Sequence, residues 1–390
     1  MREPDPAPRV ALPLGLLWLA GITLRLPVLA IPPVIPLIHH DLPLSELEVA
    51  VLTSLPVLLV ATAVLLGSWL IARGGARRAL LSGLLLTAVV SGLRGVGPSK
   101  AGLFGMTVLM GVGIAIYQPA LPSLVSVWLP TRAGLATAVY VNGLLVGETL
   151  SAGLTLPVIL PLVGGRWTRS LAVWALPILL TAGLLAWLTP RLPDAVGSPR
   201  VRWWPDWRAA RTWRLGLLLG GNSAVYFGAN TFLPDYLHAV GRPALTAAAL
   251  AVLNAAQLPA SLGVMAGAAR LVGRRGPFVA LGLAMVAGLG VVLGVGGWGP
   301  VLGAGLLGFA CGAALVLSSA LPPLVADPTE VHHVSAGMFL IGYLYAFGVP
   351  LVGGAVWDRS HVPATAFLPV ALGALTMLVA AAGLPAKGRL

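Results

Sequence analysis

Long apolar stretches, separated by short charged or turn-rich breaks, run through almost the whole sequence. A membrane-spanning helix needs about 20 consecutive, mainly apolar residues, and stretches of this length predict twelve spans. Their approximate limits are 11–38, 48–72, 78–97, 101–124, 134–163, 168–189, 213–238, 244–270, 277–296, 299–324, 334–357 and 361–385. The pattern therefore predicts an all-α integral membrane protein with twelve transmembrane helices.

The composition excludes an ordinary soluble domain. Hydrophobic residues make up 58% of the chain and charged residues 9%, whereas a soluble domain carries about 25% charged residues. The single cysteine, Cys311, excludes an internal disulfide and a cysteine-based metal cluster. The sequence contains no HExxH, P-loop or dinucleotide-binding motif. We therefore expect no enzyme activity, no cofactor and no bound metal.

The net charge of +12 has a topological explanation. If the N-terminus is cytoplasmic, 17 of the 24 Lys and Arg residues fall inside, 6 fall outside, and Arg25 remains within the membrane. Positive charge is enriched in cytoplasmic loops. The bias therefore predicts two cytoplasmic termini, and it accounts for the basic residues without a nucleic-acid partner.

The two halves of the chain resemble each other at a nearly constant offset. The matching segments are 120–125 (ALPSLV) and 320–325 (ALPPLV), 77–78 and 274–275 (both RR), Pro36 and Pro234, and 133–134 and 336–337 (both AG). Six spans repeated in parallel orientation imply two bundles related by an axis along the membrane normal, with a binding site between them near the midplane. We expect one bundle over 1–190, a cytoplasmic linker over 191–212, and a second bundle over 213–390.

Several short stretches resemble those of a known family of transporters. The loops 67–78 (GSWLIARGGARR) and 273–276 (GRRG) resemble the loop motif of the major facilitator superfamily. Stretches similar to the cyanate and 2-nitroimidazole transporter family are 24–27 (LRLP), 36–38 (PLI), 52–56 (LTSLP), 111–116 (GVGIAI), 121–124 (LPSL), 232–234 (FLP) and 257–259 (QLP). The resemblance implies two pseudo-symmetric six-helix bundles and transport by alternating access.

One permanent charge lies near the middle of the first predicted span. Arg25 cannot neutralise itself, and a guanidinium at the hydrocarbon centre costs roughly 3 to 15 kcal/mol. It must therefore face a wet cavity or a partner. Prolines beside it, at 27, 32, 33 and 36, each remove a helix hydrogen bond. We interpret Arg25 as the counter-ion of an anionic or strongly dipolar solute, and a buried ion pair made only for packing is the alternative.

The resemblance places spans one, four, seven and ten around the central cavity, so polar residues in these spans are further candidates. In the seventh span, Asn222, Tyr226 and Asn230 are spaced by four and therefore share one helix face. They either line the path or make hydrogen bonds between helices. Together with a weaker candidate in the eighth span, the predicted substrate-binding residues are Arg25, Tyr117, Gln118, Asn222, Tyr226, Asn230 and Gln257.

Glu148, in the fifth span, is the membrane-embedded carboxyl group that we select as a coupling residue. It has two interpretations. It could carry a proton during transport, or it could form a fixed ion pair with an arginine such as Arg25.

These features predict a secondary active transporter for a small anionic or small polar solute, similar to cyanate or a nitroimidazole. A broad-specificity drug exporter of the same superfamily is the alternative. The expected partners are the solute, the lipid bilayer and, if transport is proton-coupled, protons. We expect a monomer in a prokaryotic inner membrane, with both termini cytoplasmic.

Overall fold

The computed structural model describes residues 10–44, 46–96, 99–189 and 202–384. Within these ranges the chain is helical and contains no strand. The first half comprises α1 (Ala11–Leu29), α2 (Ile35–Asp41), α3 (Glu46–Gly74), α4 (Ala76–Leu93), α5 (Lys100–Tyr117), α6 (Ala120–Trp128), α7 (Ala133–Leu154), α8 (Leu160–Leu162) and α9 (Trp167–Leu188). The second half comprises α10 (Ala210–Ala239), α11 (Thr246–Ala255), α12 (Gln257–Leu271), α13 (Arg275–Gly294), α14 (Gly299–Ser319), α15 (Pro322–Val325), α16 (Val331–Ser360) and α17 (Phe367–Ala382).

The helices confirm the predicted membrane fold. Eleven helical stretches among the described residues are long and apolar enough to cross a bilayer. The remaining crossing is α10, a 30-residue helix that is less apolar because it carries several polar residues, including Asn222 and Asn230. With α10 the crossings are the twelve that the apolar pattern predicts. The expected linker over 191–212 is described from residue 202 onward, and α10 already begins at Ala210.

Several crossings are divided into two helices next to a proline. The fourth crossing is interrupted between α5 and α6 at Gln118 and Pro119, because Pro119 has no N–H to continue the helical ladder. In the first crossing, which spans Ala11–Val34, α1 ends at Leu29 and a 3-10 turn follows at Pro32–Val34; α2 lies beyond the crossing. The break at Gln118 faces the second half, because Gln118 forms a hydrogen bond with Tyr343 of α16.

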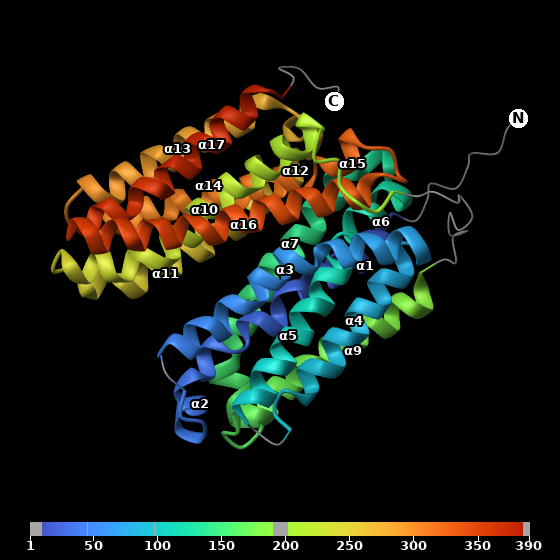
Figure 1. Cartoon of the computed structure of the whole chain (residues 1–390), viewed down its shortest axis with the longest axis horizontal. Helices are drawn as coiled ribbons and strands as arrows, with labels where there is room; N and C mark the ends of the chain where they lie inside the picture. Colours follow the sequence, from blue (N-terminus) through green and yellow to red (C-terminus); the bar gives the residue numbers. More distant parts are fainter. Residues whose placement is uncertain (1–9, 45, 97–98, 190–201, 385–390) are drawn as a thin grey trace, which may run out of the picture.

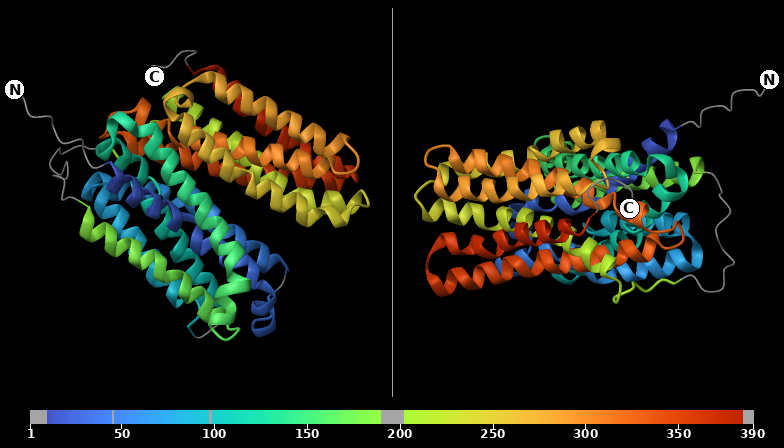
Figure 2. Two further views of the ribbon diagram at one scale, coloured as in Figure 1. Left: turned by 180° about the vertical axis from the view of Figure 1, so that it is seen from behind. Right: turned by 90° about the horizontal axis from the view of Figure 1, so that it is seen from above.

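The two halves form two bundles arranged as a V (Figure 1). The blue-to-green helices α1–α9 make one bundle, the yellow-to-red helices α10–α17 make the other, and Figure 2 shows the same division from behind. The bundles meet at one end, where α6 contacts α15 and α16. They diverge toward the end where α2 and α11 lie. We call the end at α6 and α15 the closed end.

Glycines bring α1 and α7 into backbone contact within the first bundle. A methyl group at Gly21 would overlap the carbonyl of Tyr140, and one at Gly147 would overlap the carbonyl of Ile22. Small residues allow such close approach in membrane helices. This packing determines the register of the two helices, and it places Glu148 of α7 in the same region of the bundle as Arg25 of α1.

Candidate functional site

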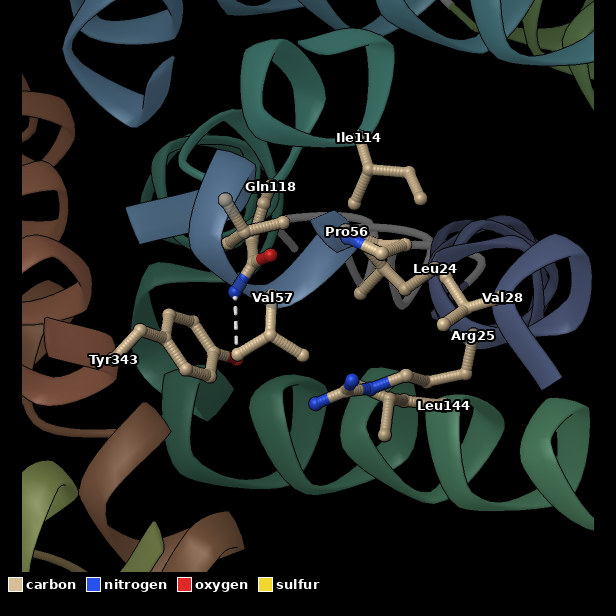
Figure 3. Close-up of a pocket in the computed structure, with 10 residues that line it drawn as sticks. Leu24, Arg25, Val28, Pro56, Val57, Ile114, Gln118, Leu144 and Tyr343 are labelled. Carbon is tan, nitrogen blue, oxygen red and sulfur yellow. Dashed lines mark hydrogen bonds between the residues drawn. The ribbon is translucent and has the colours of Figure 1, made fainter. Parts of the chain in front are cut away.

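Arg25 extends from α1 into a cavity that lies between the two bundles (Figure 3). The cavity encloses about 20 Å³, which is room for about one water-sized group. Its lining comes from both bundles: Leu24, Arg25, Val28, Pro56, Val57, Val60, Ile114, Gln118, Leu144 and Tyr343.

A second cavity, also of about 20 Å³, adjoins the first and shares Arg25, Leu144 and Tyr343 with it. Its other lining residues are Leu145, Glu148, Asn222, Ser223, Tyr226, Phe227, Gln257, Cys311 and Leu315. We refer to the two together as the central cavity. Arg25 therefore lies where both spaces meet, and it is the only permanently charged group among the residues that line them.

The Arg25 guanidinium has no protein partner among the described residues. None of them accepts a hydrogen bond from it or places a carboxylate oxygen within 4.0 Å. Glu148 and Tyr226 line the second cavity with it, and Tyr343 lines both cavities. A planar donor fork without an internal acceptor is suited to a carboxylate-like or other small anionic ligand. The fixed ion pair between Arg25 and Glu148 is absent in this conformation.

A second buried arginine, Arg94, shows what a structural role involves. Its Nη1 donates to the carbonyl of Pro27 at 2.8 Å and contacts the sulfur of Met110 at 3.1 Å. Pro27 lies in the last turn of α1, where carbonyls lack helical partners and a cation is favourable. Arg94 therefore stabilises the end of α1, whereas Arg25 lines the central cavity.

Glu148 takes part in a hydrogen-bond network that crosses between the bundles. Its Oε1 lies 2.8 Å from the hydroxyl oxygen of Tyr226 on α10. The same hydroxyl lies 2.7 Å from Oδ1 of Asn254 on α11. Asn254 Nδ2 in turn contacts Asn230 Oδ1 at 3.1 Å and the carbonyl of Leu250 at 2.9 Å. Tyr226 and Asn230 of the predicted α10 stripe are thus hydrogen-bonded to α11, and Tyr226 also to α7.

Two other polar contacts bridge the bundles. Gln118, at the break between α5 and α6, donates from Nε2 to the hydroxyl of Tyr343 on α16 at 3.1 Å (Figure 3). Asn142 on α7 donates from Nδ2 to the hydroxyl of Ser261 on α12 at 2.8 Å, and its Oδ1 accepts from Nε1 of Trp18 at 3.0 Å.

The structure brings six of the eight predicted residues to the central cavity, namely Arg25, Gln118, Glu148, Asn222, Tyr226 and Gln257. Tyr117 and Asn230 do not line it. Tyr117 is fully buried, and its hydroxyl lies 3.2 Å from Thr23 Oγ1 on α1. Asn230 donates from Nδ2 to the carbonyl of Tyr226 at 2.9 Å, and its Oδ1 accepts a hydrogen bond from Asn254 Nδ2 at 3.1 Å.

Tyr343 belongs to the site although the sequence did not select it, and Asn254, a weaker sequence candidate in the eighth span, joins the site through Tyr226. Tyr343 and Tyr345, two positions apart, cannot share one face of α16, and the apolar sequence around them gives no reason to prefer either. In the structure Tyr343 lines both cavities, whereas the hydroxyl of Tyr345 bonds Thr376 at 2.8 Å. Asn254 acts through Tyr226, so a pattern along its own helix does not reveal its role.

The two-bundle fold, with a charged cavity at the interface between the bundles, defines a membrane transporter. Residues 17–351 match the family model described as Major Facilitator Superfamily, and the chain belongs to that superfamily. A solved structure of a superfamily member, FucP in an outward conformation, superposes with a TM-score of 0.76 at 14% identity. The match covers 95% of this chain and 98% of FucP.

Three bacterial relatives are similar in sequence. The chain is 27% identical over 381 residues to the uncharacterized transporter YycB of Bacillus subtilis (strain 168), covering 96% of this chain and 92% of YycB. It is 28% identical to the cyanate transport protein CynX of Escherichia coli (strain K12), covering 87% of each chain. It is 30% identical to the 2-nitroimidazole transporter of the same strain, over 59% of this chain and 58% of that protein. These relatives confirm the resemblance seen in the short sequence stretches.

Proposed function

We propose that this protein is a secondary active transporter for a small anionic or small polar solute, and that the Arg25 guanidinium binds the solute. The observation that most supports this proposal is the unpaired guanidinium in the central cavity, which is lined by residues of both bundles. A solute held there contacts both halves of the protein, so its binding can be linked to their relative movement. The cyanate and nitroimidazole transport named for two relatives supports this class of solute.

The charge of the site supports an anionic solute. Arg25 is the only permanently charged group among the residues that line the central cavity, and it would repel a lipophilic cation. This feature favours the small-anion transporter over the alternative, a broad-specificity drug exporter.

The V shape supports alternating access. The closed end carries the loops that follow α6 and α12, where a methyl group at Gly134 would lie 3.2 Å from Val272. The excess of basic residues in the loops on this side supports a cytoplasmic location for the closed end. In the proposed orientation both termini are cytoplasmic, the protein lies in a prokaryotic inner membrane, and the conformation described here opens outward.

A thermal-shift screen of the purified protein tests the proposal. The panel contains cyanate, nitrate, small carboxylates and nitroimidazoles, with lipophilic cations as the competing class. We expect stabilisation by at least one small anion or nitroimidazole, and we expect Arg25→Ala to abolish it. Arg359→Ala is the matched control, because Arg359 is an exposed arginine at the end of α16. Stabilisation that persists in Arg25→Ala, or stabilisation by bulky cations alone, would overturn the proposal.

A further inference from the structure

We infer that residues 202–209, which precede α10, form a strap that holds the closed end shut through two consecutive main-chain carbonyls. The strap is attached to the second bundle, and the Ser68 hydroxyl on α3 is the point where the first bundle is held to it and released from it. The strap lies at the closed end, where the chain enters α10 (Figure 1). The inference concerns the movement of the bundles and does not depend on which solute is carried.

The first carbonyl is bound by the second bundle. His332, at the start of α16, lies with Nε2 3.1 Å from the carbonyl oxygen of Arg202. A carbonyl oxygen can only accept a hydrogen bond, so this ring nitrogen carries the hydrogen. The buried Pro205 also packs on α16, because a methyl group at Gly337 would lie 3.1 Å from Pro205 Cβ. The strap therefore lies directly on α16.

Further hydrogen bonds join the strap to α10 and fix its own shape. Trp213 on α10 donates from Nε1 to the carbonyl of Trp207 at 2.8 Å. Within the strap, Arg202 Nε donates to the carbonyl of Trp204 at 3.0 Å, and Arg202 Nη2 lies 3.5 Å from Asp206 Oδ1. The strap also continues without a break into α10. It therefore moves as one piece with the second bundle.

The second carbonyl is bound by the first bundle. Ser68 on α3 is fully buried, and it donates from Oγ to the carbonyl of Trp203 at 2.6 Å. Among the described residues, this is the hydrogen bond that joins the strap to the first bundle. Helices α3 and α16 also contact each other directly. Ser68 and His332 thus bind the carbonyls of adjacent residues, one from each bundle.

The bond from Ser68 favours the conformation that is closed at this end. Trp203 lies outside the helices, so no helical ladder supplies a donor to its carbonyl, and a shielded carbonyl without a donor is unfavourable. When α3 moves away from α16, the strap stays with the second bundle and the Trp203 carbonyl loses Ser68. A typical hydrogen bond of this kind corresponds to about a fivefold change in an equilibrium.

Alkylation of a cysteine on the other seam of the closed end tests the strap. Val272 follows α12 and packs beside Gly134 of α7, and the native Cys311 is buried. A cysteine placed by Val272→Cys lies on the seam between α7 and α12. Local loosening of the strap between α3 and α16 does not expose it, whereas opening of the whole closed end does. We expect alkylation to become about fivefold faster when Ser68→Ala is added.

Thr62→Ala is the matched control on the same helix. Its hydroxyl bonds within α3 to the carbonyl of Leu58 at 3.0 Å, so its removal should leave the alkylation rate unchanged. An unchanged rate with Ser68→Ala would overturn the inference. An equal acceleration by Thr62→Ala would also overturn it, because the effect would then not come from the strap.

Distances between pairs of spin labels test which bundle carries the strap. One label replaces the exposed Arg208 of the strap through Arg208→Cys. Its partner is placed either by Trp187→Cys, near the end of α9 in the first bundle, or by Arg270→Cys, near the end of α12 in the second. With Ser68→Ala added, we expect a population with a longer distance to position 187 and an unchanged distance to position 270. Any other pattern contradicts the inference, the reverse one by showing that the strap moves with the first bundle.

None of these measurements includes a solute, so the inference and the proposed function fail separately. If Ser68→Ala changes neither the alkylation rate nor the label distances, the strap is wrong and the role of Arg25 stands. If Ser68→Ala has the expected effects but Arg25→Ala leaves stabilisation by the anion unchanged, the proposed function fails and the strap stands.

Discussion

Arg25 and Glu148 lie on α1 and α7, two helices in backbone contact, yet they do not form an ion pair. Glu148 contacts Tyr226 of the opposite bundle instead. Opposite charges so placed in a low-dielectric region would normally pair. Their separation leaves a guanidinium available to a solute, and the proposed transport depends on it.

The backbone contact between α1 and α7 predicts opposite effects for two glycines of the same helix. A methyl group at Gly147 would overlap the carbonyl of Ile22, whereas nothing lies within 4 Å of one at Gly153. Gly147→Ala should lower the free energy of unfolding by about 1 to 3 kcal/mol through overpacking. Gly153→Ala should raise it by up to about 1 kcal/mol, because alanine loses less conformational entropy in a helix.

The measurement for this pair is thermal unfolding of both variants in the same detergent. Equal melting temperatures for Gly147→Ala and the wild type would show that α1 and α7 do not pack this closely. Because Gly147 packs against Ile22, three residues before Arg25 on α1, Gly147→Ala should also weaken anion stabilisation.

The bond between Asn142 and Ser261 predicts a shift in the conformational equilibrium. It joins α7 to α12 across the bundles at 2.8 Å, and a typical hydrogen bond contributes about 1 kcal/mol. Ser261→Ala should therefore shift the equilibrium about fivefold toward separation of the bundles at the closed end.

Alkylation of a cysteine at Val272, placed by Val272→Cys, reports this separation, because Val272 packs beside Gly134 and the native Cys311 is buried. We expect faster alkylation when Ser261→Ala is added. Thr231→Ala is the control, since its hydroxyl bonds within α10 to Phe227. An unchanged alkylation rate with Ser261→Ala would show that this bond does not hold the bundles together.

Asp41, beyond the first membrane crossing, predicts a pH dependence of stability. Hydrogen bonds from His40 at 3.0 Å and from Nε1 of Trp167 at 2.7 Å lower the pKa of Asp41 below its ordinary value. A lowered pKa in the folded state means that the contribution is present above the unfolded pKa of about 3.9. It is lost as the pH falls through the lower, folded pKa.

Trp167→Phe removes one of these donors. Its melting temperature should lie below that of the wild type at neutral pH, and part of the difference should disappear on acidification below about pH 3.9. A difference that does not change with pH would show that Trp167 stabilises the fold through packing alone.

Much of the fold could be predicted because its determinants are local. Each crossing is an apolar run of sufficient length, so the predicted 168–189 corresponds closely to α9 at Trp167–Leu188. The least apolar crossing, α10, was still recognisable because apolar residues flank its polar ones. The breaks at Pro119 and after Leu29 follow from the missing proline N–H.

The site was less predictable because it depends on which helix faces meet. Arg25 could be identified from the sequence because placing a guanidinium in lipid costs free energy. That cost depends on a single residue and not on which helix faces meet. The role of Tyr343 depends on the rotation of α16, and an apolar helix gives no pattern that defines that rotation. Tyr117 lies between α1 and α4, where its hydroxyl lies 3.2 Å from Thr23 Oγ1 and its Cβ faces Gly83. A polar residue at cavity depth therefore need not face the cavity.

Counterflow in liposomes tests the central claim most directly, using the anion that stabilises the purified protein most. We expect wild type and Arg359→Ala to exchange the labelled anion, and Arg25→Ala to show no exchange above empty liposomes. Exchange by Arg25→Ala at the wild-type rate would contradict the assignment of Arg25 as the anion-binding group.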